Sequence, residues 1–197
     1  DSWKQIIYYG VPGCGKSHTI TKMLEDEKLK DSSFSEENQV VRVTFHPEYT
    51  NADFIGQVMP EVINGNVKYK FKPGPFSVIL KSALLDPGRK YYLIIEEINR
   101  GNAAAIFGDV FQLLDRLKEG GTSKTQVGSD GFNNHYGKGW SEYFVMNSDV
   151  NDYIRDADNA QKLDTKAIEL SEIHFSSNTA IRLPPNFSIY ATMNTSD

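Results

Sequence analysis

The chain has 197 residues, of which 39% are hydrophobic and 24% are charged, enough for one globular domain with its own core. A net charge of −5 argues against a stand-alone nucleic-acid binder, which usually carries a basic face. No apolar run is long enough to cross a bilayer, and the single cysteine cannot form an internal disulfide, so we expect a cytoplasmic protein without membrane contact. Because residue 1 is Asp, we expect a fragment or a trimmed chain.

The first predicted elements are a strand at residues 6–9, a glycine-rich turn at residues 10–17 and a helix that ends near residue 29. The turn reads GVPGCGKS, which fits the phosphate-loop pattern of a glycine, four residues and Gly-Lys-Ser. Such a turn brings backbone N–H groups and the positive end of a helix dipole to a polyphosphate. Lys16 is predicted to contact the outer phosphates, and Ser17 to bind Mg²⁺. The residues expected to contact the nucleotide are Gly10, Pro12, Gly13, Cys14, Gly15, Lys16, Ser17 and His18.

The next segments alternate between polar connections and apolar elements. Residues 31–38 are polar and are predicted to form a surface connection, and the β-branched residues 40–45 predict a second strand. Residues 46–75 are interrupted by prolines and contain Asn64-Gly65-Asn66, a hairpin signal. Residues 76–85 show a helical period.

Residues 91–95 form a continuous apolar run, which is typical of a strand buried on both faces of a parallel sheet. The run leads directly into Glu96 and Glu97. Two carboxylates at the end of a buried strand are costly unless they meet a cation, although two solvated acids remain an alternative. We expect Glu96 to hold Mg²⁺, usually through water, and Glu97 to orient and deprotonate an attacking water.

A helix is predicted over residues 102–117, with Asn102 as its N-cap and an apolar stripe formed by Ile106, Phe107, Val110, Phe111, Leu114 and Leu117. Asn99 and Arg100 lie between the two acids and this helix. They are candidates for contact with the nucleotide or with a neighbouring subunit. The alternative is a helix-entry turn with an exposed arginine.

Residues 118–180 lose the alternation of strand and helix, which predicts an elaborate insertion rather than a second domain. Within it, residues 140–145 are a candidate strand and residues 150–160 a candidate short helix, while residues 163–173 fit either. His135 and His174 have no metal-ligand spacing around them, so surface or structural roles are expected.

Residues 187–193 predict a further core strand, which ends at Asn194. An asparagine at the tip of a strand beside the two acids is suited to hydrogen-bond the attacking water or the terminal phosphate. An ordinary turn asparagine is the alternative.

Four patches in order resemble one family. Residues 10–17 resemble the phosphate loop of AAA+ proteins. Residues 96–102, with Ile106-Phe107-Gly108 after them, resemble the "DEINR…N…FGE" segment of McrB-type AAA+ proteins. Residues 45–49 followed by Asp53-Phe54-Ile55 are similar to their "FH-x-x-Y…DFI" stretch, and residues 192–197 to their "MNTAD" sensor strand.

The resemblance implies an α/β fold: the large subdomain of an AAA+ P-loop NTPase over residues 1–197, with a parallel sheet flanked by helices. It implies an insert at the second helix over about 46–75, a hairpin insertion within about 118–183, and a helical lid and arginine finger beyond residue 197. Known members are GTP-driven motor subunits of 5-methylcytosine-specific restriction systems; they form hexameric rings, recruit a McrC-type endonuclease and read DNA through another domain. By the match, Lys16 and Ser17 are the phosphate and Mg²⁺ residues, Glu96 the metal-site acid, Glu97 the catalytic acid and Asn194 the sensor.

Two departures from the family bear on activity. Glu96 stands where the family usually has Asp, and its extra methylene moves the carboxylate. Without a finger and lid, this piece alone is expected to hydrolyse nucleotide poorly. Two other functions stay open: an ATPase of the MoxR or dynein-related kind that remodels a protein, and a nucleotide-gated assembly module with little hydrolysis. GTP is favoured over ATP only because the nearest known relatives use it; Asn194-Thr195-Ser196-Asp197 lacks the lysine of the Asn-Lys-x-Asp guanine reader.

Overall fold

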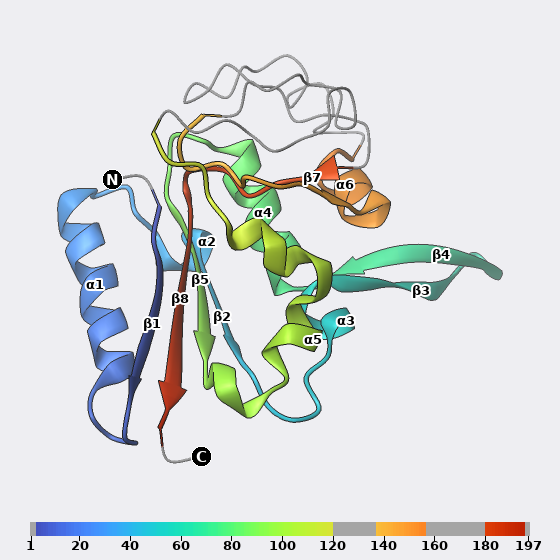
Figure 1. The fold of residues 1–197 in the computed structure, drawn as a ribbon. Helices are drawn as coiled ribbons and strands as arrows, with labels where there is room; N and C mark the ends of the chain where they lie inside the picture. Colours follow the sequence, from blue (N-terminus) through green and yellow to red (C-terminus); the bar gives the residue numbers. More distant parts are fainter. Residues whose placement is uncertain (1–2, 120–136, 157–179, 196–197) are drawn as a thin grey trace.

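A computed structural model describes residues 3–119, 137–156 and 180–195 (Figure 1). Its centre is a parallel sheet of four strands in the order β1-β8-β5-β2. The strands are β1 (Gln5–Gly10), β2 (Val40–Thr44), β5 (Tyr91–Glu96) and β8 (Phe187–Asn194). All four were predicted from their sequences, with ends that differ by at most one residue. The structure thus confirms a parallel α/β sheet.

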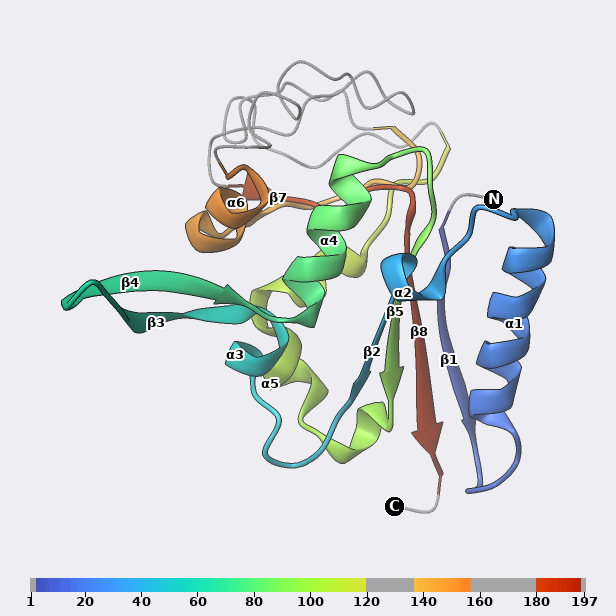
Figure 2. The same cartoon turned by 180° about the vertical axis from the view of Figure 1, so that it is seen from behind.

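Helices cover both faces of this sheet, as Figures 1 and 2 show. On one face, α1 (Lys16–Lys30) buries Ile20 and Leu24 against Tyr92, Ile94 and Tyr190. On the other face, α4 (Pro75–Leu85) and α5 (Ala103–Phe107) pack against Leu93 and Ile95 in the larger core cluster. Alternate residues of β5 therefore enter opposite cores, which explains its continuous apolar sequence.

The hairpin predicted at Asn64-Gly65 is confirmed, and it is longer than its sequence signal. Strands β3 (Gly56–Ile63) and β4 (Asn66–Pro73) pair antiparallel over eight residues each. Asn64 and Gly65 both have positive φ, at 51° and 77°, as a two-residue hairpin turn requires. The hairpin extends away from the sheet next to the short helix α3 (Asn51–Phe54) (Figure 1).

The prediction of one helix over residues 102–117 is wrong. The α-helix stops at Phe107, and a 3₁₀ segment, η2 (Gly108–Leu114), follows it. Gly108 takes φ +52°, and the Asn51 side chain donates to the Ile106 carbonyl, so the helical hydrogen-bond ladder ends there. Phe111, expected in the apolar stripe, is 52% exposed as a result.

Other segments also differ from their predictions. The connection at residues 31–38 is not purely a surface loop, because Phe34 is buried and the short helix α2 (Glu36–Gln39) begins within it. Of residues 140–145 only Val145 enters a strand, β6 (Val145–Met146), which pairs with β7 (Ala180–Ile181). The short helix is α6 (Ser148–Ile154). Residues 163–173, His135 and His174 lie outside the described residues.

A buried arginine, Arg116, connects the backbone at Gly139 and at residues 183–184 to strand β8. Arg116 is 6% exposed and donates to the carbonyls of Gly139, Leu183, Pro184 and Phe187 at 2.7–3.0 Å. Burial lowers the pKa of its guanidinium to about 9, so it still carries its charge at pH 7. The four carbonyl acceptors compensate for that burial.

Candidate functional site

The parallel sheet brings the carboxyl ends of its strands to one edge. In the register of the sheet, Gly10 at the end of β1 pairs with Asn194 of β8, and Thr44 of β2 pairs with Glu96 of β5. A cavity of about 300 Å³ opens at this edge. The residues that line it are Pro12, Gly13, Gly15, Lys16, Ser17, His18, Glu97, Thr192 and Asn194.

The glycine-rich turn forms one wall of the cavity. Gly13 and Gly15 take φ of +79° and +87°, in the left-handed region that side chains with a Cβ rarely adopt. Helix α1 starts at the next residue, Lys16, and Gly15 at its N-cap has no side chain to accept from the first helical N–H groups. These amides and the positive end of the helix dipole therefore remain suited to an anionic ligand.

Lys16 connects this turn to the end of β8. Its ammonium donates to the carbonyls of Gly10 and Val11 at 2.8 and 2.9 Å and to Asn194 Oδ1 at 2.8 Å. Cys14 is exposed, and its Sγ lies 3.7 Å from the same ammonium. The Lys16 ammonium therefore lies against the backbone of the turn, and its three oxygen acceptors are all neutral.

Glu96 lies opposite the start of α1. Its Oε2 accepts from Ser17 Oγ at 3.1 Å and from Thr192 Oγ1 at 2.7 Å, and its Oε1 lies 3.6 Å from Arg42 Nη1. A carboxylate and a hydroxyl oxygen in direct contact beside a phosphate loop are donors that Mg²⁺ accepts, so these residues fit a magnesium ion. Among the described residues, groups of three or more His, Cys, Asp or Glu that would bind a metal by themselves are absent.

Glu97 has an unusual backbone conformation. Its φ of 55° and ψ of 47° are left-handed, which costs a residue with a side chain about 1–2 kcal/mol. Its N–H donates to Thr192 Oγ1 at 3.1 Å, and its Oε2 accepts from Asn194 Nδ2 at 2.5 Å. These two contacts with β8 hold the carboxylate at the mouth of the cavity. A strained, side-chain-bearing residue at such a place is a recurrent feature of functional sites.

Asn99 and Arg100 follow in the short 3₁₀ turn η1 (Ile98–Arg100). Asn99 Nδ2 donates to the backbone carbonyl of Asn194 at 2.9 Å, so Asn99 supports the tip of β8 from outside the cavity. The Arg100 side chain is exposed and is not part of the cavity wall. The structure therefore brings the predicted site residues together, except Arg100. Asn99 contributes through its hydrogen bond to the backbone of Asn194.

Two polar residues of this site were not predicted from the sequence: Thr192 and Arg42. Thr192 lies two residues before Asn194 on β8, and residues at that spacing share one face of a strand. Arg42 is the single charged residue in the otherwise β-branched β2 sequence VVRVT. Both signals are visible in the sequence once the strands are known to be neighbours.

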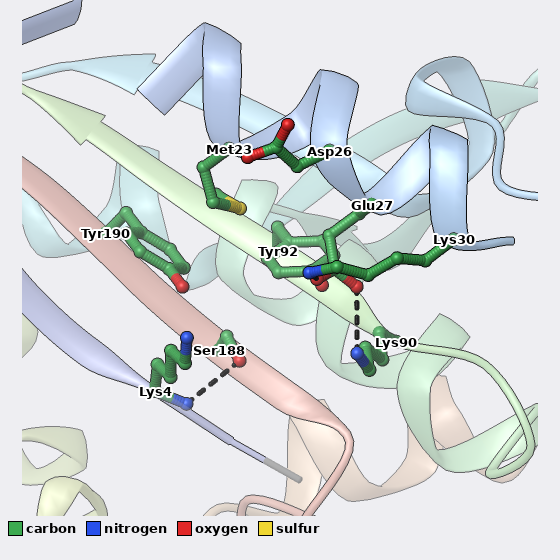
Figure 3. Close-up of a pocket in the computed structure, with 9 residues that line it drawn as sticks. All are labelled: Lys4, Met23, Asp26, Glu27, Lys30, Lys90, Tyr92, Ser188 and Tyr190. Atoms are coloured by element: carbon green, nitrogen blue, oxygen red, sulfur yellow. Dashed lines mark hydrogen bonds and ion pairs between the residues drawn. The ribbon is translucent and has the colours of Figure 1, made fainter. Parts of the chain in front are cut away.

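A second polar cavity, of about 350 Å³, lies at the opposite, amino-terminal end of the strands (Figure 3). Glu27 of α1 lies at its edge and accepts from Lys30 and Lys90 at 3.1 and 2.8 Å. Tyr92 and Tyr190 form its floor, and burial is the main cause that raises the pKa of both phenols, that of Tyr190 to about 12. Because Lys30 and Lys90 already pair with Glu27, the polar groups at this cavity are best explained as an ion-pair network that joins α1 to the residue before β5.

The sequence comparison with family models matches residues 5–137 to the AAA domain of the dynein-related subfamily. The chain belongs to this family. Its members are P-loop nucleoside triphosphatases, which agrees with the parallel sheet and with the position of the glycine-rich turn. The described helices include none that is both long and apolar enough to cross a bilayer.

Two curated relatives are components of restriction systems. The type II restriction enzyme BsuMI component YdiS of Bacillus subtilis (strain 168) is 34% identical over 97% of this chain, which spans 50% of YdiS. The type IV methyl-directed restriction enzyme EcoKMcrB subunit of Escherichia coli (strain K12) is 36% identical over 59% of this chain and 24% of that protein. The chain thus spans half or less of the length of either relative. A crystal structure of a candidate ATPase from Cytophaga hutchinsonii aligns with a TM-score of 0.37 at 15% identity, covering 98% of this chain and 35% of that one.

Proposed function

We propose that this chain is the nucleotide-binding and hydrolysing core of a motor subunit in a restriction system of the McrB kind, one that acts on DNA carrying 5-methylcytosine. The observation that carries the proposal is one continuous hydrogen-bond network at the carboxyl edge of the sheet. It runs from Lys16 through Asn194 to Glu97, and from Glu97 through Thr192 to Glu96 and Ser17. YdiS and McrB, both components of restriction systems, support the biological setting.

In this proposal the glycine-rich turn and the first turn of α1 bind the phosphates through backbone N–H groups. Lys16 exchanges its contacts with Gly10 and Val11 for the outer phosphate oxygens, which carry the charge that the neutral carbonyls lack. Pro12 and His18 line the same cavity, and Cys14 belongs to the turn beside them; no chemical role is assigned to these three residues.

Ser17 and Glu96 would hold the Mg²⁺ ion, which neutralises charge on the β- and γ-phosphates when it is bound. The serine proton continues to donate to Glu96 Oε2 while its oxygen lone pair faces the ion, so the observed 3.1 Å contact is compatible with the bound state. Glu97 acts as general base toward the attacking water. Asn194 holds Glu97 on one side and Lys16 on the other, and so connects the base to the phosphate site.

The preferred nucleotide is proposed to be GTP. The proposal assigns to the full-length protein a hexameric ring, a McrC-like endonuclease partner and DNA contact through another domain. The match to a dynein-related subfamily favours one second candidate, an ATPase that remodels a protein partner. A gene for a McrC-type nuclease beside this one favours the restriction function, and its absence favours the second candidate. Multiple-turnover phosphate release rejects a third possibility, a nucleotide-gated module without useful hydrolysis.

The deciding experiment is a titration of the full-length protein with fluorescent GTP and ATP, with and without Mg²⁺, followed by phosphate release at saturating nucleotide. Tight Mg²⁺-dependent binding of GTP with multiple turnovers is expected. Preference for ATP shifts the assignment to the remodelling ATPase, and failure to bind either nucleotide contradicts the proposal.

A further inference from the structure

Glu96 reaches further from its strand than an aspartate would, and the structure shows what holds the end of this longer side chain. Its two carboxylate oxygens have different partners: Oε2 accepts from Ser17 and Thr192, and Oε1 faces the Arg42 guanidinium at 3.6 Å. Glutamate has one more rotatable bond than aspartate, so its carboxylate has more orientations to lose when it is fixed at a metal site.

Arg42 approaches Glu96 from the neighbouring strand. In the register of β2 and β5, Arg42 lies beside Ile94 and Thr44 beside Glu96, so the arginine starts two residues earlier and extends toward the edge of the sheet. The exposed fractions of the two side chains are 38% for Arg42 and 22% for Glu96. An ion pair this open contributes little to the free energy of folding, so its effect is expected on the orientation of the carboxylate.

We propose that Arg42 is a positioning residue for the metal-site acid: it fixes Glu96 Oε1 so that Oε2 stays directed at Ser17. This inference rests on the proposed function and refines the role of Glu96 within it. Without Arg42, the carboxylate can rotate and exchange its two oxygens, and the ion loses a fixed acceptor for its coordinated water. An aspartate at position 96 would hold its carboxylate one methylene further from the guanidinium, so we expect the role of Arg42 to depend on the glutamate.

The test measures the Mg²⁺ concentration that gives half-maximal binding of a fluorescent GTP analogue to the full-length protein. Wild type, Arg42→Gln, Glu96→Asp and the double variant are compared, with Arg89→Gln as the matched control. Arg89 is also exposed and also pairs with an acid, Asp86, but it precedes β5, at the opposite end of that strand from Glu96. Thermal unfolding of each variant establishes that it is folded.

Arg42→Gln is expected to raise the half-saturating Mg²⁺ concentration about 3- to 10-fold, while Arg89→Gln leaves it unchanged. In the Glu96→Asp background the same Arg42→Gln change is expected to shift it less than about 2-fold. An equal shift in both backgrounds overturns the proposal, because the arginine then acts without Glu96. No shift also overturns the proposal, because the arginine then has no effect on Mg²⁺ binding. A lower half-saturating concentration overturns it because the guanidinium then only repels the ion. If wild type itself shows no Mg²⁺-dependent binding, the proposed function has failed, which is visible before any variant is compared.

Discussion

The side-chain amide of Asn194 donates to Glu97 Oε2 at 2.5 Å and accepts from Lys16 Nζ at 2.8 Å. One residue at the tip of β8 thus contacts both the cation of the phosphate loop and the acid assigned as general base. Both contacts depend on the order of the strands, because β8 lies between β1 and β5. In the proposed function, a movement of Lys16 on phosphate binding would therefore reach Glu97 through this single amide.

Replacing Glu97 by Gln is expected to leave nucleotide binding intact and to slow turnover about 100-fold or more. The glutamine keeps an oxygen that accepts from Asn194 Nδ2, so the geometry of the site is retained while the base is lost. Phosphate release at saturating nucleotide measures the turnover, and fluorescent-nucleotide titration measures the binding. Glu37→Gln, at an exposed position of α2, is the matched control. Unchanged turnover in Glu97→Gln would remove Glu97 from the mechanism.

Replacing Thr192 by Val is expected to lower kcat about 10-fold or more and to destabilise the fold by about 1–2 kcal/mol. The threonine hydroxyl donates to Glu96 and accepts from the N–H of Glu97, and valine fills the same space without either bond. The strained conformation of Glu97 then loses one of its two contacts with β8. Steady-state kinetics and denaturant unfolding measure the two effects.

Thr192→Ser keeps the hydroxyl and serves as the control. We expect it to retain most of the activity, with a small loss of stability from the missing methyl group. A serine variant as impaired as the valine variant would show that packing rather than hydrogen bonding explains the effect.

The sequence allowed the prediction of the sheet strands and of the residues around the phosphate loop, because these signals are local. An apolar run predicts a buried strand, and Gly13, Gly15 and Lys16 stand at fixed spacing within eight residues. The gathering of Glu96, Glu97 and Asn194 at one edge was expected as well, since parallel strands end together.

The remaining features depend on contacts between distant segments. The helix after Asn102 ends early because the side chain of Asn51, about 55 residues away, donates a hydrogen bond to the carbonyl of Ile106. The apolar periodicity of the helix itself gives no sign of this contact. Arg42 and Thr192 join the site only because β2 and β8 both flank β5. A pattern within one strand does not reveal its neighbours.

Arg116→Met is expected to destabilise the protein by about 3 kcal/mol or more. The methionine fills similar space but leaves the buried carbonyls that Arg116 serves without their donor. Denaturant unfolding at pH 7 measures the loss, and Arg89→Met, at an exposed arginine, is the control. A loss below about 1 kcal/mol would mean that water replaces the guanidinium at these carbonyls.

Lys90→Met is expected to cost about 1 kcal/mol of stability at pH 7, and this cost is expected to disappear as the pH falls through the lowered pKa of Glu27. Burial alone would raise the pKa of Glu27, which is 15% exposed, but the hydrogen bonds from Lys90 and Lys30 outweigh it and hold the pKa below the ordinary 4.5 (Figure 3). Because the folded-state pKa is the lower one, this stabilisation is present above 4.5 and is lost as the pH falls through the lowered pKa. Urea unfolding of wild type and variant across this range measures the difference, with Lys28→Met on the same helix as the control. A difference that stays constant down to pH 2 would place the effect of Lys90 in packing rather than in its pair with Glu27.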